Sequence, residues 1–234
     1  MILYLFDIDG TLLRAKRAGG RAFERVFREQ HGLERACEGV RFGGRTDPSL
    51  VDEVFTTRLG RRPTPDEHAA FFAAYLPLMR ADLETGGVEV IDGVHDALAW
   101  LAARPDVVLG VATGNVRGGA DAKLAAAGLE GQFALGGYGC DSHVRAELVA
   151  AAIARGKQRA EVREVVVIGD TVHDISAARA CGAIACAVTT GSDPAEALGH
   201  ADVVFGSLRE LPAWHAARFG AVTAAGAPTG PADR

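Results

Sequence analysis

The polarity pattern of the chain changes soon after its first short apolar run. Residues 2–6 ("ILYLF") are continuously apolar and are followed by acidic residues, as expected for a buried strand that ends there. From residue 14 to about residue 86, apolar positions recur at helical spacing instead. Phe23, Val26 and Phe27, for example, are separated by Arg and Glu. This pattern predicts a helical segment that no strand interrupts.

Beyond residue 88 the pattern alternates between β-branched apolar runs and Ala-rich helical stretches. The strands are expected at 107–113, 133–139, 165–169, 184–190 and 202–206, with helices at 96–105, 119–129, 145–156 and 174–182. Continuous apolar strands separated by helices indicate a parallel sheet that is covered on both faces. The fold class is therefore predicted as α/β, a doubly wound, Rossmann-like parallel sheet with an inserted all-helical cap.

The domain boundaries follow from these changes of pattern. Residues 1–14 and 87–219 are assigned to the α/β core and residues 15–86 to the helical cap. Right-handed crossovers would place the cap above the carboxyl ends of the strands, where such sheets bind ligands. Residues 220–234 are small, unpatterned and contain Pro and Gly, so we expect a disordered tail.

A helix start is recognisable inside the cap. "GRTDPSLVDEVF" offers Thr46 or Asp47 as the N-cap, with Pro48 at the first helical position.

Composition narrows the classes of function. The 234 residues carry a formal net charge of −5 and form no basic stripe, so neither a nucleic acid nor an anionic membrane is an expected partner. The four cysteines are scattered without a CxxC pair, which argues against a zinc site or a disulfide framework. The opening "MILYLF" is short, has no basic residue and is stopped by Asp7, so we expect neither a signal peptide nor a membrane span. A cytoplasmic protein is predicted.

Polar side chains gather where three of the predicted strands end. Asp7 and Asp9 follow the first strand, Thr113 ends another, and Asp170 and Asp174 follow a third. These strand ends would share one edge of the sheet, where four carboxylates would repel one another. A hard cation such as Mg²⁺ removes that conflict and is usually held by carboxylates together with substrate phosphate. Alternatively, each Asp only caps a turn or a helix. This explanation is reasonable for one aspartate, but it does not account for four of them at matching strand ends.

The motifs that contain these residues are similar to those of a known family. "DIDGT" (7–11), "VATGN" (111–115) and "GDTVHD" (169–174) resemble the first, second and fourth motifs of the haloacid dehalogenase superfamily. "FGGRTD" (42–47) and "GAIACAVTTG" (182–191) resemble its phosphoglycolate-phosphatase-like branch, which carries a helical cap after the first motif. The resemblance covers nearly the whole chain and implies a Mg²⁺-dependent phosphatase that hydrolyses a small phosphorylated metabolite.

The resemblance also implies roles for the acidic residues. Asp7 is expected to be the nucleophile that forms an aspartyl-phosphate. Asp9 is expected to be the general acid and then the general base, and its backbone carbonyl to ligate Mg²⁺. Asp7 and Asp170 are expected to bind the metal directly. Asp174 either binds it through water or orients its neighbours.

The remaining site residues are expected to bind phosphate or substrate. Gly10 allows a sharp turn that exposes backbone N–H groups to phosphate oxygens. The Thr113 hydroxyl is expected to donate to a phosphoryl oxygen. Thr11 and the backbone of Gly114 and Asn115 complete the phosphate site, and Arg45 either reaches the substrate from the cap or has a surface or capping role.

The third motif of the family departs from its usual pattern here. Relatives place a lysine in a Lys-Pro pair, whereas residues 139–153 contain neither lysine nor proline. Arg145, at the start of the predicted helix, is the expected replacement because its guanidinium suits phosphate. Lys123 is the rival, although its position favours a solvated helix lysine.

Several other functions compete with a phosphatase. A dehalogenase lacks the acid at the position of Asp9, and a phosphonatase needs a cap lysine, for which only Lys16 is present. A phosphomutase acting on a small sugar phosphate stays open because it differs mainly in the acceptor. A phosphorylation-dependent signalling or binding module is the alternative from another class. The ester could be phosphoglycolate, a sugar phosphate or a nucleoside monophosphate, and the chain could be a monomer or a homodimer.

Overall fold

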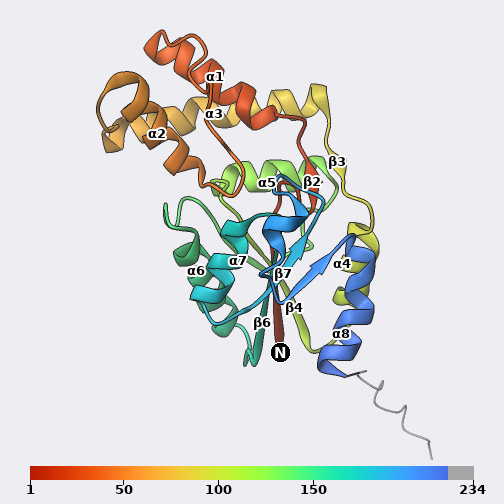
Figure 1. Ribbon diagram of the computed structural model, residues 1–234. Coiled ribbons are helices and arrows are strands. Elements are labelled where there is room, and N and C mark those ends of the chain that lie inside the picture. Colours follow the sequence, from red (N-terminus) through yellow and green to blue (C-terminus); the bar gives the residue numbers. More distant parts are fainter. Residues whose placement is uncertain (221–234) are drawn as a thin grey trace, which may run out of the picture.

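A six-stranded parallel sheet forms the centre of the computed structural model, which describes residues 1–220 (Figure 1). Its strand order is β5-β4-β1-β6-β7-β8, and each neighbouring pair is parallel. The strands are β1 (Ile2–Phe6), β4 (Val107–Ala112), β5 (Leu135–Gly137), β6 (Glu164–Gly169), β7 (Ile184–Val188) and β8 (Val203–Phe205). Strand β1 lies in the middle and is buried throughout, which is why its sequence is continuously apolar.

Helices cover both faces of this sheet, as the alternating pattern predicted. They are α4 (Val94–Ala102), α5 (Arg117–Ala126), α6 (Arg145–Lys157), α7 (Val172–Ala180) and α8 (Leu211–Phe219). Alternate residues of β1 belong to two separate apolar clusters, Tyr4 and Phe6 on one face and Leu3 and Leu5 on the other. Helices α6 and α7 lie on one side of the sheet and α4 and α8 on the other (Figure 1). The doubly wound α/β fold is confirmed.

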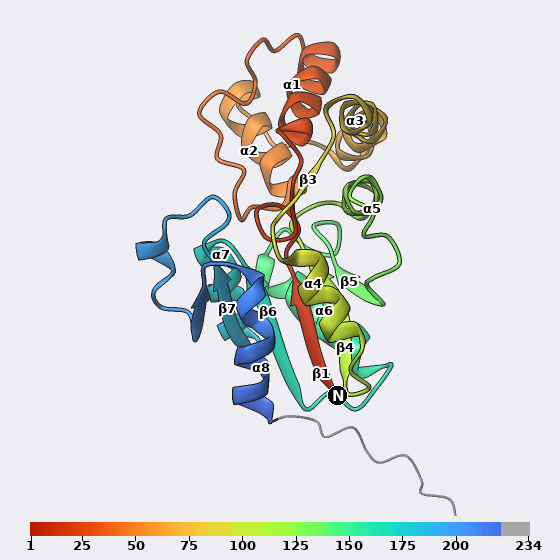
Figure 2. The same ribbon diagram turned by 90° about the vertical axis from the view of Figure 1, so that its right-hand side faces the viewer.

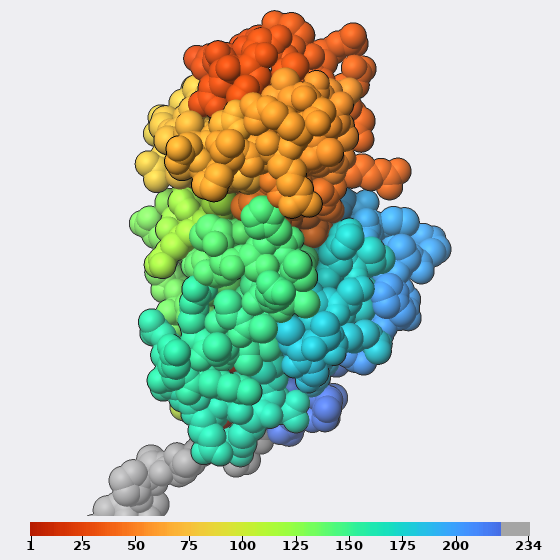
Figure 3. Space-filling view, turned by 90° about the vertical axis from the view of Figure 1, so that its left-hand side faces the viewer, coloured from red at the N-terminus to blue at the C-terminus, as the bar shows by residue number. Residues whose placement is uncertain are grey.

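A helical insert lies beyond the carboxyl ends of the strands (Figure 2). It consists of α1 (Ala18–His31), α2 (Asp47–Leu59) and α3 (Pro65–Gly86). Aromatic rings hold it together, with Phe71 4.9 Å from Phe23 and 4.8 Å from Phe27 between ring centroids. The space-filling view shows the insert resting directly on the core (Figure 3). The insert therefore roofs the edge of the sheet at which the predicted site residues end.

The start of α2 distinguishes the two candidate caps. The Thr46 hydroxyl accepts a hydrogen bond from the Ser49 N–H at 3.3 Å, so Thr46 is the N-cap. Asp47 is the first helical residue and Pro48 the second, one position later than expected. This leaves the Asp47 side chain available for another contact.

Some elements were not predicted from the sequence. A short antiparallel pair, β2 (Leu13–Arg14) and β3 (Glu89–Val90), joins the two connections between the core and the insert. Two-residue strands are too short to show an alternating pattern. Helix α8 was also missed, and β5 is shorter than the predicted strand at 133–139. Apart from Gly220, the predicted disordered tail lies outside the described residues.

Within residues 1–220, no helix is both long and apolar enough to cross a membrane.

A buried tyrosine–histidine pair joins β1 to the last helix. The Tyr4 hydroxyl lies 2.6 Å from Nδ1 of His215, whose side chain is 1% exposed. Burial lowers the pKa of His215 below its usual value of 6.5, and the charge of Arg104 lowers it further, against the opposing effect of Asp106. The fold therefore favours the neutral imidazole.

This pair predicts an acid-sensitive contribution to stability. As pH falls below 6.5, the unfolded chain binds a proton at His215 that the folded chain resists, so the free energy of unfolding decreases. His215→Gln removes this titration, and its weaker contact with Tyr4 should cost about 1 kcal/mol at neutral pH. Urea unfolding between about pH 7.5 and about pH 5.5 should then show a smaller decrease than in wild type. His95→Gln, at an exposed position of α4, should behave as wild type, and an unchanged pH dependence in His215→Gln would contradict the assignment.

Candidate active site

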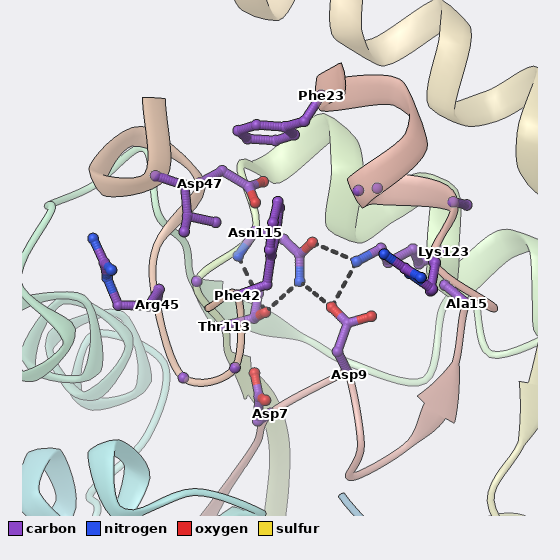
Figure 4. Close-up of a pocket in the computed structure, with 18 of the residues that line it drawn as sticks. Asp7, Asp9, Ala15, Phe23, Phe42, Arg45, Asp47, Thr113, Asn115 and Lys123 are labelled. Carbon is purple, nitrogen blue, oxygen red and sulfur yellow. Dashed lines mark hydrogen bonds and ion pairs between the residues drawn. The ribbon is translucent and has the colours of Figure 1, made fainter. Parts of the chain in front are cut away.

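A pocket of about 270 Å³ lies between the carboxyl ends of the central strands and the helical insert (Figure 4). Its floor is polar and comes from the core, whereas much of its roof is apolar and comes from the insert. The floor includes Asp7, Asp9, Thr113, Asn115, Lys123 and Arg145, and the roof includes Phe23, Phe42, Leu50 and Tyr75. A ligand in this pocket would meet charged groups on one side and aromatic rings on the other.

Three buried carboxylates meet at the edge of the sheet. Asp7 follows β1, and Asp170 and Asp174 follow the neighbouring strand β6. One oxygen from each lies within 4.8 Å of the others, and the three residues are at most 5% exposed. The strand ends therefore bring together three of the four acids that the sequence placed there.

The electrostatics of this cluster fit a divalent cation. Burial is the main cause that raises the pKa of Asp7 to about 7. Repulsion from Asp174 and Asp170 adds to the increase, and the charge of Arg145 opposes it. Burial and the charge of Asp174 likewise raise the pKa of Asp170 to about 6. Carboxylate oxygens are the donors that Mg²⁺ prefers, and a cation would relieve the repulsion. Asp7, Asp170 and Asp174 can thus hold such a metal.

Asp9 does not join this cluster. Its carboxylate is turned toward α5, where its Oδ2 lies 2.6 Å from Nζ of Lys123 and 2.8 Å from Nδ2 of Asn115. Lys123 Nζ also donates to Asn115 Oδ1 at 2.7 Å, which closes a triangle of polar contacts (Figure 4). Asp9 is therefore held in a fixed position beside the carboxylate cluster, and its side chain is not part of the metal-binding set.

The expectation that Lys123 is a solvated helix lysine was wrong. Its side chain is 7% exposed, and its ammonium is paired with Asp9 and Asn115. The reason is that α5 begins directly after the end of β4 and also packs against α3, so this face of the helix is enclosed by both the core and the insert. A lysine so enclosed needs an acceptor, and Asp9 supplies it.

Arg145 lies where the sequence placed the cation of the third motif. It is the first residue of α6 and 9% exposed, and its Nε donates to Asp174 Oδ1 at 2.8 Å. Its Nη2 lies 2.9 Å from Asp7 Oδ1 and 2.6 Å from Asp174 Oδ1. The neighbouring carboxylates outweigh burial and raise its pKa. Nη2 is fully enclosed and forms ion pairs with both carboxylates, so the guanidinium is fixed beside Asp7 and Asp174.

The second motif contributes side chains more than backbone groups. Thr113 is fully buried, and its hydroxyl accepts hydrogen bonds from Asn115 through both the backbone N–H (3.3 Å) and Nδ2 (2.8 Å). The Thr113 hydroxyl hydrogen is not used by any acceptor in residues 1–220, so it can donate into the pocket. The Gly114 carbonyl accepts from the Asp47 N–H at 2.8 Å and so binds the insert.

Gly10 and Thr11 support the metal-binding cluster. Gly10 has φ 84°, and a Cβ there would lie 2.6 Å from Asp170 Oδ2, so the sharp turn and the close approach both require glycine. The Thr11 hydroxyl donates to Asp170 Oδ1 at 3.3 Å. Thr11 is fully buried and does not line the pocket, so its visible contact is with a carboxylate ligand.

Two residues of the insert, Arg45 and Asp47, line the pocket. Arg45 lies at the pocket, but its guanidinium is paired with Glu53 at 2.5 Å and donates to the Ser49 carbonyl. The structure therefore shows its guanidinium bound to the first turns of α2, through Glu53 and the Ser49 carbonyl. Asp47 was considered only as a helix cap, yet it is 8% exposed, lines the pocket and accepts a hydrogen bond from the Val116 N–H at 2.8 Å. Nothing in the sequence pattern separated it from an ordinary helix-start residue.

The fold and site define a hydrolase class, and comparison with known proteins identifies the family. A model of the haloacid dehalogenase-like hydrolases matches residues 3–182. The chain belongs to this family, as its motifs predicted, and is a hydrolase of the haloacid dehalogenase type.

Two curated relatives are similar over most of their length. Validoxylamine A 7'-phosphate phosphatase of Streptomyces hygroscopicus subsp. limoneus is 30% identical over 88% of this chain and 94% of its own. Probable phosphatase IndB of Dickeya dadantii is 30% identical over 81% of each chain. Both relatives are phosphatases by name.

Solved structures share the fold at lower identity. CbbY of Rhodobacter sphaeroides in complex with phosphate has a TM-score of 0.68 at 21% identity, over 89% of this chain and 95% of that one. A putative beta-phosphoglucomutase from Bacteroides vulgatus has a TM-score of 0.69 at 20% identity, over 94% of this chain and 90% of that one. These likenesses establish the architecture.

Removal of one carboxylate from the cluster should raise the stability of the metal-free protein and weaken metal binding. Asp170→Asn removes one of three buried negative charges, so without metal at about pH 8 it should raise the free energy of unfolding by about 1–2 kcal/mol. It should also lose most of the stabilisation that Mg²⁺ gives to wild type. Urea unfolding with EDTA and with Mg²⁺ measures both effects. Asp121→Asn on the exposed face of α5 is the control. Lower stability of Asp170→Asn in EDTA would contradict the repulsion described here.

Proposed function

We propose that this hydrolase is a Mg²⁺-dependent phosphatase that cleaves a small phosphomonoester through an aspartyl-phosphate on Asp7. The observation that carries the proposal is the arrangement of Asp7 beside Asp170 and Asp174 and in contact with the Arg145 guanidinium. An attacking carboxylate, a set of acids that can hold a metal and a cation paired with the attacking group thus converge at the floor of one pocket. Phosphoryl transfer needs this combination because its catalysis depends mainly on positioning and charge neutralisation.

The first step uses Asp7 as the nucleophile. A carboxylate oxygen of Asp7 attacks phosphorus as the bond to the leaving oxygen breaks. Arg145 Nη2, 2.9 Å from Asp7 Oδ1, is placed to donate to a phosphoryl oxygen, and the Thr113 hydroxyl can donate to another. Mg²⁺ held by Asp7, Asp170 and Asp174 would neutralise charge on the phosphate and allow one anion to approach another.

The second aspartate of the first motif, Asp9, transfers the proton. Asp9 donates its proton to the departing alkoxide and then takes a proton from the water that hydrolyses the aspartyl-phosphate. Its side chain lines the pocket and is 44% exposed despite its contacts with Lys123 and Asn115, so it is held in place yet accessible. These contacts make Lys123 a positioning residue for Asp9, whereas Arg145 faces the phosphate.

The pocket favours a small substrate. Its volume of about 270 Å³ lies below the usual range of drug-sized ligand sites, and the insert roofs it. We propose that residues 15–86 act as a cap that excludes water during turnover. The name of the Streptomyces relative gives validoxylamine A 7'-phosphate as its substrate, so phosphate esters of small polar molecules are the class to test first.

Phosphate release from a panel of esters tests the reaction. Phosphoglycolate, glucose 6-phosphate, validoxylamine A 7'-phosphate, a nucleoside monophosphate and p-nitrophenyl phosphate are assayed with Mg²⁺ and with EDTA. Metal-dependent release of inorganic phosphate is expected. Asp7→Asn should lower kcat by at least about 10³-fold while it keeps the fold, because the amide cannot form the acyl-phosphate. Near-normal turnover by Asp7→Asn would overturn the proposal, and return of phosphate to a sugar hydroxyl would favour a phosphomutase.

The two site cations should differ in their kinetic effects. Arg145→Ala removes the group beside Asp7 and should lower kcat by about 10²–10⁴-fold with every ester. Lys123→Ala releases Asp9 and should matter most for esters with poor leaving groups. The ratio of kcat for an alkyl phosphate to kcat for p-nitrophenyl phosphate separates the two roles, because only the alkoxide needs a proton. An equal loss on both esters in Lys123→Ala would contradict its assignment to Asp9.

A further inference from the structure

Asp47 is held rigidly between the insert and the core. Its backbone N–H donates to the Gly114 carbonyl and its Oδ2 accepts from the Val116 N–H, both at 2.8 Å. Gly114 and Val116 belong to the segment between β4 and α5, whereas Asp47 begins α2. Two contacts on one residue leave its carboxylate little freedom to turn, so its orientation toward the pocket is fixed before any ligand arrives.

The second carboxylate oxygen of Asp47, Oδ1, accepts no hydrogen bond from the described part of the protein. Oδ1 has no hydrogen-bond partner within residues 1–220, although Asp47 is 8% exposed. The residue lines the pocket, and Figure 4 shows its carboxylate turned toward the space between Phe23 and Asn115. Oδ1 is not one of the enclosed polar atoms without a partner, so it is accessible from the pocket and can accept a hydrogen bond from a bound ligand in place of water.

The residues around Asp47 indicate which kind of ligand would donate a hydrogen bond to Oδ1. Phe23, Phe42 and Leu50 give this part of the pocket an apolar lining, and the Tyr75 hydroxyl donates only to the weak sulfur acceptor of Met79 at 3.1 Å. A pocket with an apolar wall and a few fixed polar atoms binds a molecule that has both C–H faces and hydroxyl groups. A negatively charged group placed next to Oδ1 would be repelled by Asp47, whereas a hydroxyl there could donate to it.

We propose that Asp47 selects the substrate by accepting a hydrogen bond at Oδ1 from a hydroxyl of the leaving group, which makes the substrate class phosphorylated polyols. The inference rests on the proposed phosphatase function and adds the identity of the alcohol. Asp47 takes no part in the attack on phosphorus or in the proton transfer. It positions the alcohol so that its phosphate reaches Asp7 and Arg145.

Matched esters with and without hydroxyl groups test this assignment in the wild-type protein. myo-Inositol 1-phosphate and cyclohexyl phosphate have the same ring and differ in the hydroxyls. We expect wild type to show a kcat/KM for the inositol ester that is about tenfold to one-hundredfold higher, as for one hydrogen bond to a charged group. Equal values, or a preference for cyclohexyl phosphate, would overturn the inference and leave the phosphatase function standing. Failure to hydrolyse either ester or p-nitrophenyl phosphate would instead refute the proposed function.

Asp47→Asn reverses the polarity of the pocket-facing atom. The Asn oxygen can still accept from the Val116 N–H, and the amide NH₂ then replaces the free acceptor. The preference for the inositol ester, measured as the ratio of kcat/KM for the two esters, should fall about tenfold or more. Asp66→Asn, an exposed acid at the start of α3, should keep the wild-type ratio. Because the ratio is measured within one variant, a general loss of folded protein does not affect it. An Asp47→Asn protein with the wild-type ratio would contradict the proposal.

Discussion

The burial of three carboxylates at one edge of the sheet is the constraint on which the rest of the site depends. Asp7, Asp170 and Asp174 are almost fully enclosed, and their mutual repulsion is only partly offset within the protein, by Arg145. An apolar cluster of the same shape would cost less free energy, and a divalent cation, which the three acids can hold, would remove much of this cost. Nearby residues support this cluster, because the left-handed turn at Gly10 and the Thr11 hydroxyl both lie against Asp170.

The same edge of the sheet also carries the contacts between the core and the insert. Arg145 reaches the Gly44 carbonyl with Nη1 at 3.4 Å, and Asp47 is bonded to both Gly114 and Val116. Residues that face the phosphate site are therefore neighbours of residues that hold the roof. Under the proposed function, this arrangement lets the protein contact the alcohol part of a substrate and its phosphate at the same time. A ligand that binds both Arg145 and Asp47 contacts the core and the insert together. A ligand that binds only one of these residues contacts only one of the two parts.

The sequence predicted the sheet and its acidic edge well because both rest on strong local signals. Continuous apolar runs that end in Asp7 or in Asp170 can belong only to buried strands that finish at a polar site, and parallel strands bring such ends together. The choice of Arg145 for the third motif agrees with its position against Asp7. Lys123 and Asp47 were misjudged because their environments are created by distant segments: α5 is enclosed only when α3 packs on it, and Asp47 meets Val116 only when the insert lies on the core. The strands β2 and β3 were too short to leave any pattern.

The central claim is that Asp7 accepts the phosphoryl group, and trapping the intermediate tests it most directly. The enzyme is mixed with its best ester and Mg²⁺, quenched with acid within one turnover, digested, and the peptides are examined by mass spectrometry. The account predicts one phosphoryl group on the peptide that contains Asp7, which appears and disappears at rates compatible with turnover and is absent in Asp7→Asn. Rapid hydrolysis with no phosphorylated peptide, or with the phosphoryl group on another residue, would contradict it.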